Sequence, residues 1–277
     1  MDYGDLEVEE SKVEDILTLG HDVLKVDLRR NSMKYVRDKI VPERQIELYV
    51  NGKTYAVFLC LGSKIKELIV GHLLTEGLID GIHEIESVNV AENKIYVHLA
   101  KELNLSLEKP RIILTMCSGR TGKVLPHVWM KRSVKEAHSI KVDPRVIIEA
   151  IKKLNSKAYV FKETGATHSS ALFNERGELL AFSEDIGRHN TIDKVVGEAA
   201  FKGVNFKKTL LVSTGRLTSE MVVKAANVGI PVIVSISAPT DRGIKIAELA
   251  GLTLIGFARG KRFNVYTHPE RILNVFT

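Results

Sequence analysis

The sequence has little cysteine, few aromatic residues and no long hydrophobic run. Its 277 residues include only Cys60 and Cys117, which argues against a disulfide scaffold and excludes a cysteine-rich zinc site. Histidine and acidic metal ligands remain open on composition alone. No apolar segment approaches the roughly 20 residues that cross a bilayer. The first residues are acidic and lack the charged-then-apolar pattern of a signal peptide. We therefore expect a cytoplasmic protein with no membrane contact.

Aromatic residues make up only 6% of the chain, and no basic run is interleaved with them. Base stacking is thus poorly supported, and we do not expect nucleic-acid binding. The formal net charge is +6, which favours anionic partners such as a nucleotide cofactor or an acidic protein. A Lys- and Glu-rich surface, as in thermophiles, would give the same balance.

The residue pattern divides the chain into three parts. Residues 1–30 pass from acidic to basic with little apolar periodicity, which is typical of a tail. Residues 31–140 alternate apolar segments with turns, the pattern of hairpins. Asp143-Pro144 is a strong helix start, because an N-cap residue precedes a first-turn proline. Over residues 141–277 strands alternate with helices, so we predict an α+β N-terminal part and an α/β domain with parallel strands.

The expected elements follow from periodicity and turn residues. An Asn51-Gly52 turn joins two strands of a hairpin, and Ser63 is expected to cap the first helix. Strands are expected at 46–50, 55–59, 87–90, 95–99, 111–114, 168–173, 178–182, 209–212, 232–236 and 252–257. Helices are expected at 64–76, from 144 onward, and at 191–200, 218–228 and 241–250.

One segment gathers reactive side chains where a strand is expected to lead into a helix. It reads Glu184-Asp185-Ile186-Gly187-Arg188-His189-Asn190-Thr191-Ile192-Asp193-Lys194. Gly187 permits a tight or left-handed backbone, and His189 and Asn190 lie near the start of the helix. Helix N-termini attract anions. The segment therefore predicts a site for a phosphate-bearing ligand, although a capped helix start with surface charges would have the same sequence.

Three expected strand ends in the C-terminal part share small residues and an arginine. They are residues 213–216, 237–243 and 257–262. Ligands of open α/β sheets bind beyond the carboxyl ends of the strands, and arginine suits phosphate because its planar fork donates two parallel hydrogen bonds. Together with Arg188, these loops predict an anion cradle.

Cys117 lies in a polar loop close to Arg120 and Lys123. Neighbouring cations stabilise a thiolate and make it nucleophilic at neutral pH. Cys60, inside an expected strand, instead fits a small buried hydrophobe. The sequence supplies no nearby His–acid pair that would indicate protease or acyltransferase chemistry. A thiolate that accepts and passes on one sulfur atom needs no such pair.

Segment 184–194 resembles the Glu-Asp-Val-Gly-Arg-His-Asn-x-x-Asp-Lys signature of the FdhD family of formate dehydrogenase accessory sulfurtransferases. The resemblance extends from about residue 43 to the C-terminus. It includes residues 47–57, 66–79, 164–172, 213–223, 229–240 and 250–266, and Arg271.

The resemblance implies a cytoplasmic, often dimeric protein with a three-layer core similar to the cytidine deaminase fold. Family members accept persulfide sulfur from a cysteine desulfurase. They pass it to the bis(molybdopterin guanine dinucleotide) cofactor, which carries molybdenum or tungsten, and so activate formate dehydrogenase. No zinc is expected, because zinc deaminases use a Cys-x-x-Cys pair that this chain lacks.

The resemblance, for Cys117 and residues 257–262, and the predicted anion cradle, for the rest, together give the candidate residues. Cys117 falls in the loop that carries the persulfide cysteine, and Asp185, His189 and Asp193 would lie near the cofactor. The candidate cofactor-binding residues are Phe257, Ala258, Arg259, Gly260, Lys261, Arg262, Arg188, His189, Asn190, Gly215, Arg216, Ser237 and Thr240.

The chain departs from the family at its cysteines. Many members carry Cys-x-x-Cys in this loop, and the two positions correspond here to Ser118 and Thr121, with Cys117 one residue earlier. A single thiol is enough to hold a persulfide. Three hypotheses therefore stand: a sulfur relay through Cys117, a non-catalytic chaperone for the guanine dinucleotide cofactor, and a nucleotide-modifying enzyme of deaminase descent.

Overall fold

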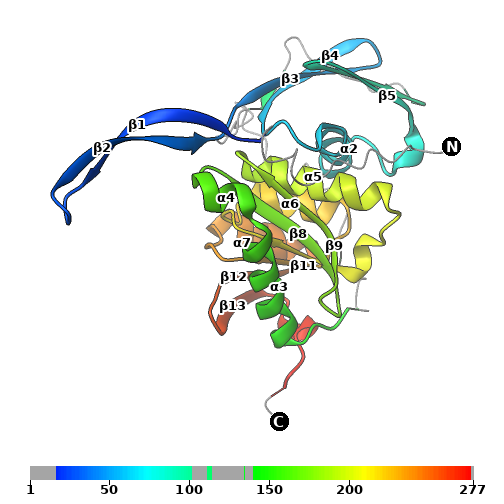
Figure 1. Ribbon diagram of the computed structural model, residues 1–277. Helices are drawn as coiled ribbons and strands as arrows, with labels where there is room; N and C mark the ends of the chain where they lie inside the picture. Colours follow the sequence, from blue (N-terminus) through cyan, green and yellow to red (C-terminus); the bar gives the residue numbers. More distant parts are fainter. Residues whose placement is uncertain (1–16, 102–110, 114–133, 135–139, 276–277) are drawn as a thin grey trace.

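The structure is a computed structural model that describes residues 17–101, 111–113, 134 and 140–275 (Figure 1). It is a mixed α/β fold, as predicted, with two large sheets and a separate two-stranded arm. Within the described ranges, no helix is both long and apolar enough to cross a membrane.

The C-terminal sheet has the strand order β13-β12-β11-β10-β8-β9. Strands β10, β11 and β12 are parallel, whereas β8, β9 and β13 add antiparallel edges. The strands are β8 (His168–Asn174), β9 (Leu179–Asp185), β10 (Thr209–Ser213), β11 (Val232–Ser235), β12 (Thr253–Arg259) and β13 (Arg262–Thr267). The central strands are continuous apolar runs because both of their faces are buried.

Helices cover both faces of this sheet and make three layers (Figure 1). Alternate residues of β10, such as Leu210 and Val212, pack with α3, whereas Leu211 packs toward α5, α6 and α7. The helices are α3 (Pro144–Lys157), α4 (Tyr159–Thr164), α5 (Arg188–Phe201), α6 (Ser219–Asn227) and α7 (Asp241–Ala250). As predicted, Asp143 caps α3 by accepting a hydrogen bond from the Arg145 amide. The implied likeness to cytidine deaminases stays a prediction.

The N-terminal sheet has the order β5-β6-β3-β4-β7 and packs on helix α2 (Ile65–Thr75). Its strands are β3 (Arg44–Val50), β4 (Lys53–Cys60), β5 (Ile85–Ala91), β6 (Lys94–Leu99) and β7 (Arg111–Ile113), and short 3-10 helices lie at η1 (Ile82–Glu84), η3 (Phe206–Lys208) and η4 (Pro269–Arg271). The hairpin around Asn51-Gly52 is confirmed, with positive φ at both turn residues. The cap by Ser63 is wrong, because left-handed Lys64 is the N-cap and no side chain bonds there.

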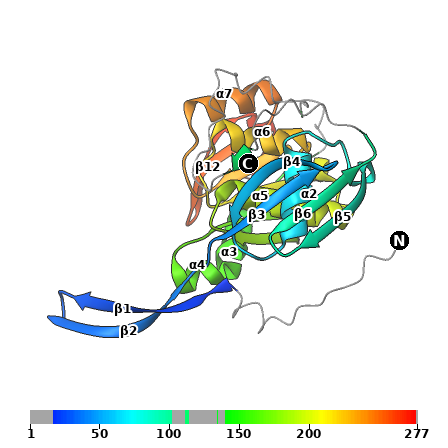
Figure 2. The same ribbon diagram turned by 90° about the horizontal axis from the view of Figure 1, so that it is seen from above.

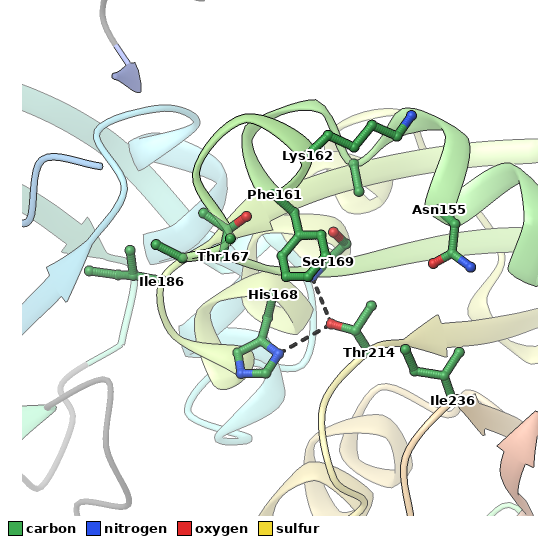
Figure 3. A pocket seen from close by; sticks show the side chains of 12 residues that line it. Asn155, Phe161, Lys162, Thr167, His168, Ser169, Ile186, Thr214 and Ile236 are labelled. Carbon is green, nitrogen blue, oxygen red and sulfur yellow. Dashed lines mark hydrogen bonds between the residues drawn. The ribbon is translucent and has the colours of Figure 1, made fainter. Parts of the chain in front are cut away.

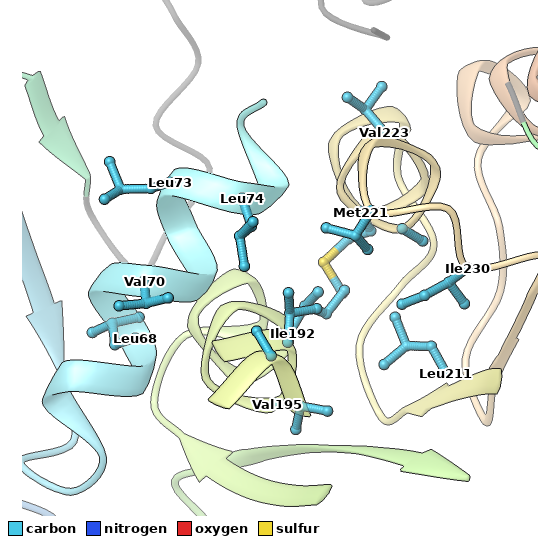
Figure 4. Close-up of a cluster of buried hydrophobic side chains, with 14 of the residues drawn as sticks. Leu68, Val70, Leu73, Leu74, Ile192, Val195, Leu211, Met221, Val223 and Ile230 are labelled. Carbon is cyan, nitrogen blue, oxygen red and sulfur yellow. The ribbon is translucent and has the colours of Figure 1, made fainter. Parts of the chain in front are cut away.

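Helices α2 and α5 cross in backbone contact between the two sheets. A Cβ on Gly71 would lie 1.7 Å from the Asp193 carbonyl oxygen, and one on Gly197 would lie 2.0 Å from the Glu67 carbonyl oxygen. Only glycine fits at either position. Figure 4 shows the apolar side chains of α2, α5 and α6 meeting around this crossing. One hydrophobic core therefore runs across the boundary near residue 140 that the sequence pattern indicates.

The sequence pattern missed an antiparallel hairpin at the N-terminal end. Strands β1 (Leu19–Asp27) and β2 (Ser32–Ile40) pair over nine residues each. The predicted tail of residues 1–30 is therefore wrong over β1, and its boundary falls inside the hairpin's turn. Figures 1 and 2 show that the hairpin projects away from both sheets. We call β1, β2 and their turn the arm.

We expect Gly71→Ala to destabilise the protein by about 2 kcal/mol, the upper end of the balance between two effects. Alanine gains about 1 kcal/mol of helix propensity over glycine, but overpacking costs about 1–3 kcal/mol, and here the clash is with rigid backbone. Urea unfolding measures the change. The control is Lys66→Ala, exposed on the same helix, which should shift stability by about 0.5 kcal/mol at most. Equal stability of Gly71→Ala and the wild type would contradict the backbone contact.

Candidate functional site

Several chain segments meet at one edge of the C-terminal sheet. Strands β10 and β11 end there at Ser213 and Ser235. Because β8 is antiparallel to β10 and to β9, β8 begins and β9 ends at this same edge, with His168 opposite Asp185. The strand ends that the sequence predicted as a site therefore lie at this edge. His168 lies at the same edge, although the sequence pattern did not single it out.

Thr214 fixes the start of β8 at this edge. Its hydroxyl oxygen accepts a hydrogen bond from the Ser169 amide at 3.0 Å and lies 3.2 Å from His168 Nδ1 (Figure 3). Its own amide donates to the Ser169 carbonyl oxygen at 3.0 Å. The His168 ring is therefore held against the loop that follows β10.

Positive charges surround His168. Arg188 begins α5 and Arg216 follows β10. A Cβ on Gly215 would lie 2.9 Å from Arg188 Cβ, so glycine makes room for the arginine. Burial, followed by the charges of Arg188, His189 and Arg216, holds the pKa of His168 below its ordinary value. We call the side chains of His168, Arg188, His189 and Arg216 the cation cluster. The electric field of this cluster favours the binding of an anion.

His189 is positioned by a carboxylate on the next helix. Its Nε2 lies 3.1 Å from Glu220 Oε2 in the first turn of α6. The histidine holds the pKa of Glu220 below its usual range. Glu220 therefore orients the His189 imidazole at the edge of the cation cluster. Its negative charge offsets part of the positive charge of the cluster.

A pocket of about 510 Å³ adjoins the cation cluster (Figure 3). It shares His168 with the cluster, and Thr214 and Phe161 of α4 also line it. Its other lining residues are Asn155, Ala158, Lys162, Gly165, Ala166, Thr167, Ser169, Ile186 and Ile236. An apolar pocket with a few polar groups beside a cationic patch suits a planar ring attached to phosphate.

Asp185 is fully buried and holds the start of α5. It accepts hydrogen bonds from the Leu61 amide at 3.0 Å, the Gly187 amide at 2.9 Å and Asn190 Nδ2 at 2.9 Å. Lys194 Nζ lies 2.6 Å from the same carboxylate. Asn190, predicted to bind cofactor, is thus engaged within the protein. Gly187 has an ordinary φ of −102°, and α5 already begins at Arg188.

The preceding residue, Glu184, holds the pocket wall. Its carboxylate accepts hydrogen bonds from the amides of Val160 at 2.9 Å and Phe161 at 2.8 Å, at the start of α4. It also accepts one from the Thr167 hydroxyl at 2.9 Å. The carboxylate therefore satisfies amides that α4 itself leaves unpaired and fixes the backbone of α4 at the pocket wall.

Asp193 lies in a different buried network, between α2, α5 and α6. Both of its carboxylate oxygens accept hydrogen bonds from Lys224 Nζ at 2.9 Å, and His72 Nδ1 lies 3.2 Å away. Burial opposes ionisation of both partners, but their pairing keeps the pKa of Asp193 low and that of Lys224 high. The sequence-based placement of Asp193 beside a ligand is therefore not matched. Lys224 was missed because nothing in the sequence pairs it with Asp193.

Residues 257–262 form a β-hairpin, where a loop after the last strand was expected. Strand β12 continues to Arg259, Gly260 turns with φ +59°, and β13 returns from Arg262. Arg259 Nε donates to the Ile236 carbonyl oxygen at 2.8 Å, whereas Ala258 is buried and Lys261 is exposed. Phe257 is 43% exposed. The hairpin therefore lies beside the loop after β11, and cofactor binding by it stays a prediction.

Two further candidate residues support neighbouring loops. Ser237 donates its hydroxyl hydrogen bond to the Thr214 carbonyl oxygen at 3.0 Å. Thr240 caps α7 by accepting a hydrogen bond from the Gly243 amide at 3.1 Å. These residues position the site edge rather than contribute charge to it.

Cys117, the candidate catalytic residue, lies outside the described residues. Cys60 is buried in β4, and burial, followed by the charge of Asp185, raises the pKa of its thiol to about 12. Cys60 is therefore inert as a nucleophile. No group of three or more His, Cys, Asp and Glu among the described residues could hold a metal ion.

The fold and site define a mixed α/β protein with a candidate anion site at the strand ends. Its Cys60 thiol is buried in β4. The chain matches the FdhD/NarQ family over residues 41–273 and belongs to that family.

Known relatives share most of the chain. It is 34% identical to the sulfur carrier protein FdhD of Methanothermobacter thermautotrophicus, covering 91% of this chain and 97% of the relative. It is 40% identical to that of Saccharolobus solfataricus, covering 79% and 83% respectively. A crystal structure from Desulfotalea psychrophila, assigned as a formate dehydrogenase accessory protein, has the same fold. Its TM-score is 0.75 at 24% identity, with 93% of this chain and 100% of that chain covered.

We expect an anion bound at the cation cluster to raise the pKa of His168. The free imidazole is neutral because its pKa is held low, and a nearby anion favours the protonated form. By linkage, the anion binds more tightly as pH falls through the His168 titration. NMR titration of the His168 ring with and without pyrophosphate measures this, and His168→Gln assigns the signal. An unchanged pKa at saturating pyrophosphate would place the anion elsewhere.

Proposed function

We propose that this chain is a sulfur carrier that binds the bis(molybdopterin guanine dinucleotide) cofactor, with molybdenum or tungsten, and sulfurates it for formate dehydrogenase. The observation that carries this proposal is the cation cluster around His168 beside an apolar pocket. Relatives that share most of the chain are named sulfur carrier proteins, which supports the sulfur step.

In this proposal the cofactor is the protein's substrate, and its diphosphate lies at the cation cluster. Arg188 and Arg216 donate paired hydrogen bonds to phosphate oxygens, while neutral His168 adds a donor or an acceptor. The guanine ring lies in the neighbouring pocket against Phe161. Thr214 holds the His168 ring and Glu184 holds the Phe161 backbone before the ligand arrives, so ordering these two residues costs little conformational entropy on binding.

The sulfur step requires a thiolate at Cys117. This thiolate attacks the terminal sulfur of a persulfide on a cysteine desulfurase, and the desulfurase cysteine leaves as a thiolate. Delivery of that sulfur as sulfide needs two electrons. A thiol reductant supplies them by attacking the Cys117 sulfur, which leaves a mixed disulfide at Cys117 and releases sulfide toward the cofactor. A second thiol then restores Cys117.

A non-catalytic cofactor chaperone is the second candidate. The chaperone function is favoured by the composition of the cation cluster, which contains only arginine and histidine side chains. Such a cluster can bind a guanine dinucleotide without a thiol. The two functions differ at Cys117→Ala. A carrier loses formate dehydrogenase activation while it retains cofactor binding, whereas a chaperone retains both.

We expect intact-mass spectrometry to detect one added sulfur atom after incubation with a cysteine desulfurase and cysteine. The addition should be absent from Cys117→Ala and reversed by a reductant, because the persulfide is held by that thiol. Cys60→Ala is the matched control and should still gain sulfur, since the Cys60 thiol is buried and protonated. Absence of sulfur on the wild type, with a competent desulfurase, would leave the chaperone as the function.

We expect Arg216→Gln to weaken binding of guanosine diphosphate by about ten-fold or more, because a charge-assisted hydrogen bond contributes about 1.5–3 kcal/mol. Isothermal titration calorimetry measures the change. Arg176→Gln is the charge-matched control, since Arg176 is exposed in the turn at the opposite end of β8 and β9. Loss of binding in Arg262→Gln, with Arg216→Gln unaffected, would move the site to the β12–β13 hairpin.

A further inference from the structure

Helices α5 and α6 begin at the same edge of the C-terminal sheet. Each follows a strand that ends at this edge, so both helices run away from it in the same direction. The second residue is His189 in α5 and Glu220 in α6, and the sixth residue is Asp193 in α5 and Lys224 in α6. Residues four apart lie on one face of a helix, about one turn or 5.4 Å along its axis. The two facing pairs therefore form two rungs between the helices.

The first rung, between His189 and Glu220, lies at the site edge. His189 Nε2 is buried and lies 3.1 Å from Glu220 Oε2. A carboxylate only accepts hydrogen bonds, so the proton of the neutral imidazole belongs on Nε2. His189 Nδ1 bonds no residue in the described part of the chain. This nitrogen is therefore the one left for a ligand of the cation cluster.

The second rung, between Asp193 and Lys224, is buried. Lys224 Nζ lies 2.9 Å from both carboxylate oxygens of Asp193, and the two side chains are 6% and 2% exposed, respectively. Helix α2 closes this rung on a third side, because Thr75 donates to Asp193 at 2.6 Å and Glu76 lies 3.1 Å from Lys224 Nζ. Both charges are thus paired and hydrogen-bonded, as buried charges require.

A buried ion pair is weak evidence for stability, since apolar side chains of similar volume often stabilise a core as well or better. Its best-attested role is to fix the register of packed elements, because a buried charge that moves away from its partner is strongly disfavoured. The apolar side chains around the second rung, which include Ile192 and Met221 (Figure 4), have no such directionality. A slide of α6 by one turn would separate both rungs together.

The charges of the two rungs also act on each other. The hydrogen bond from His189, together with the charges of His189 and Lys224, holds the pKa of Glu220 below its usual range, although burial acts the other way. Glu220 therefore stays ionised and remains an acceptor for Nε2–H.

We propose that the Asp193–Lys224 pair is a positioning element of the candidate site. The pair fixes the register of α6 against α5, so that Glu220 meets His189 and holds the imidazole with Nδ1 toward the ligand. An anion at the cation cluster then accepts a hydrogen bond from Nδ1 of the protonated ring, which Glu220 stabilises. This inference rests on the proposed function for the identity of the anion, the diphosphate of the cofactor.

The first test measures pyrophosphate binding to Glu220 variants by isothermal titration calorimetry. If Glu220 acted through its charge alone, its removal would tighten anion binding, so the sign of the change identifies its role. We expect Glu220→Leu to weaken binding by about ten-fold, the effect of one lost charge-assisted hydrogen bond. Glu220→Gln should bind at least as tightly as the wild type, because its amide oxygen still accepts from Nε2–H. Tighter binding by Glu220→Leu would overturn the proposal.

Glu248→Leu is the matched control for this test. Glu248 lies on α7, outside the cation cluster, with its carboxylate 3.8 Å from His268 Nε2. Its replacement removes the same charge beside another histidine, and pyrophosphate affinity should not change.

The second test removes the buried pair without a change in formal net charge. His72→Leu/Asp193→Leu/Lys224→Met replaces it with apolar side chains, and His72 is included because its Nδ1 lies 3.2 Å from Asp193 and would lose that partner. We expect thermal unfolding close to that of the wild type and pyrophosphate binding weakened about as much as in Glu220→Leu. Wild-type affinity in this variant would overturn the positioning role.

Asp193→Asn is the milder variant if the apolar one does not fold. Its amide keeps an acceptor for Lys224. Loss of a negative charge by itself predicts tighter anion binding, whereas a weakened register predicts looser binding. Looser binding supports the proposal, and tighter binding overturns it.

Nitrogen NMR of the His189 ring tests the positioning without a ligand, and His189→Gln assigns the signal. Above about pH 8 an ordinary imidazole is neutral. We expect the proton on Nε2 in the wild type and in Glu220→Gln, and a mixture of the two tautomers in Glu220→Leu and in the apolar variant. A mixture in the wild type would contradict the proposed contact.

The outcomes separate this inference from the proposed function. A wild type that binds no pyrophosphate overturns both the anion site and the positioning role. Equal binding by the wild type and all Glu220 and Asp193 variants overturns the positioning role alone. Sulfur addition at Cys117 does not depend on either result.

Discussion

The buried ion pair between Asp185 and Lys194 is the interaction on which the site depends. Both side chains are fully buried, and their charged atoms are 2.6 Å apart. A buried charge that loses its partner costs about 3–5 kcal/mol, so the two must stay together. Each also bonds the backbone of Leu61. The pair therefore locks the first turn of α5 to the connection between β4 and α2, which fixes Arg188 and His189 at the sheet edge.

Glu184 extends this anchoring to the opposite wall of the site. Asp185 holds the cation cluster, whereas Glu184 holds α4 through the amides of Val160 and Phe161. Val160 in turn packs on Leu61 and the root of the arm. Two adjacent carboxylates thus tie the cluster, the pocket and the arm into one rigid unit.

The signature segment shows how residues of one motif divide their roles. Six of its polar or charged residues bond partners away from the cation cluster, and two, Arg188 and His189, belong to the cluster, where His189 pairs with Glu220. The engaged residues are Glu184, Asp185, Asn190, Thr191, Asp193 and Lys194. A motif rich in reactive groups therefore need not place them all at a ligand, since the buried polar groups of a strand-to-helix turn need hydrogen-bond partners of their own.

The sequence alone determined most elements of the two large sheets and the gathering of basic residues at the candidate site. Alternation, the Asn51-Gly52 turn and the Asp143-Pro144 start specify their elements because these signals act over a few residues. Tertiary structure decided the rest. Only antiparallel pairing brings the His168 ring within 3.2 Å of the Thr214 hydroxyl, and only the packing of α2, α5 and α6 joins Asp193 to His72 and Lys224. Such contacts between distant residues arise from packing and charge pairing, which produce no periodic pattern in the sequence. The sequence did not predict the arm, because its strands have no buried face that would impose an alternation of apolar and polar residues.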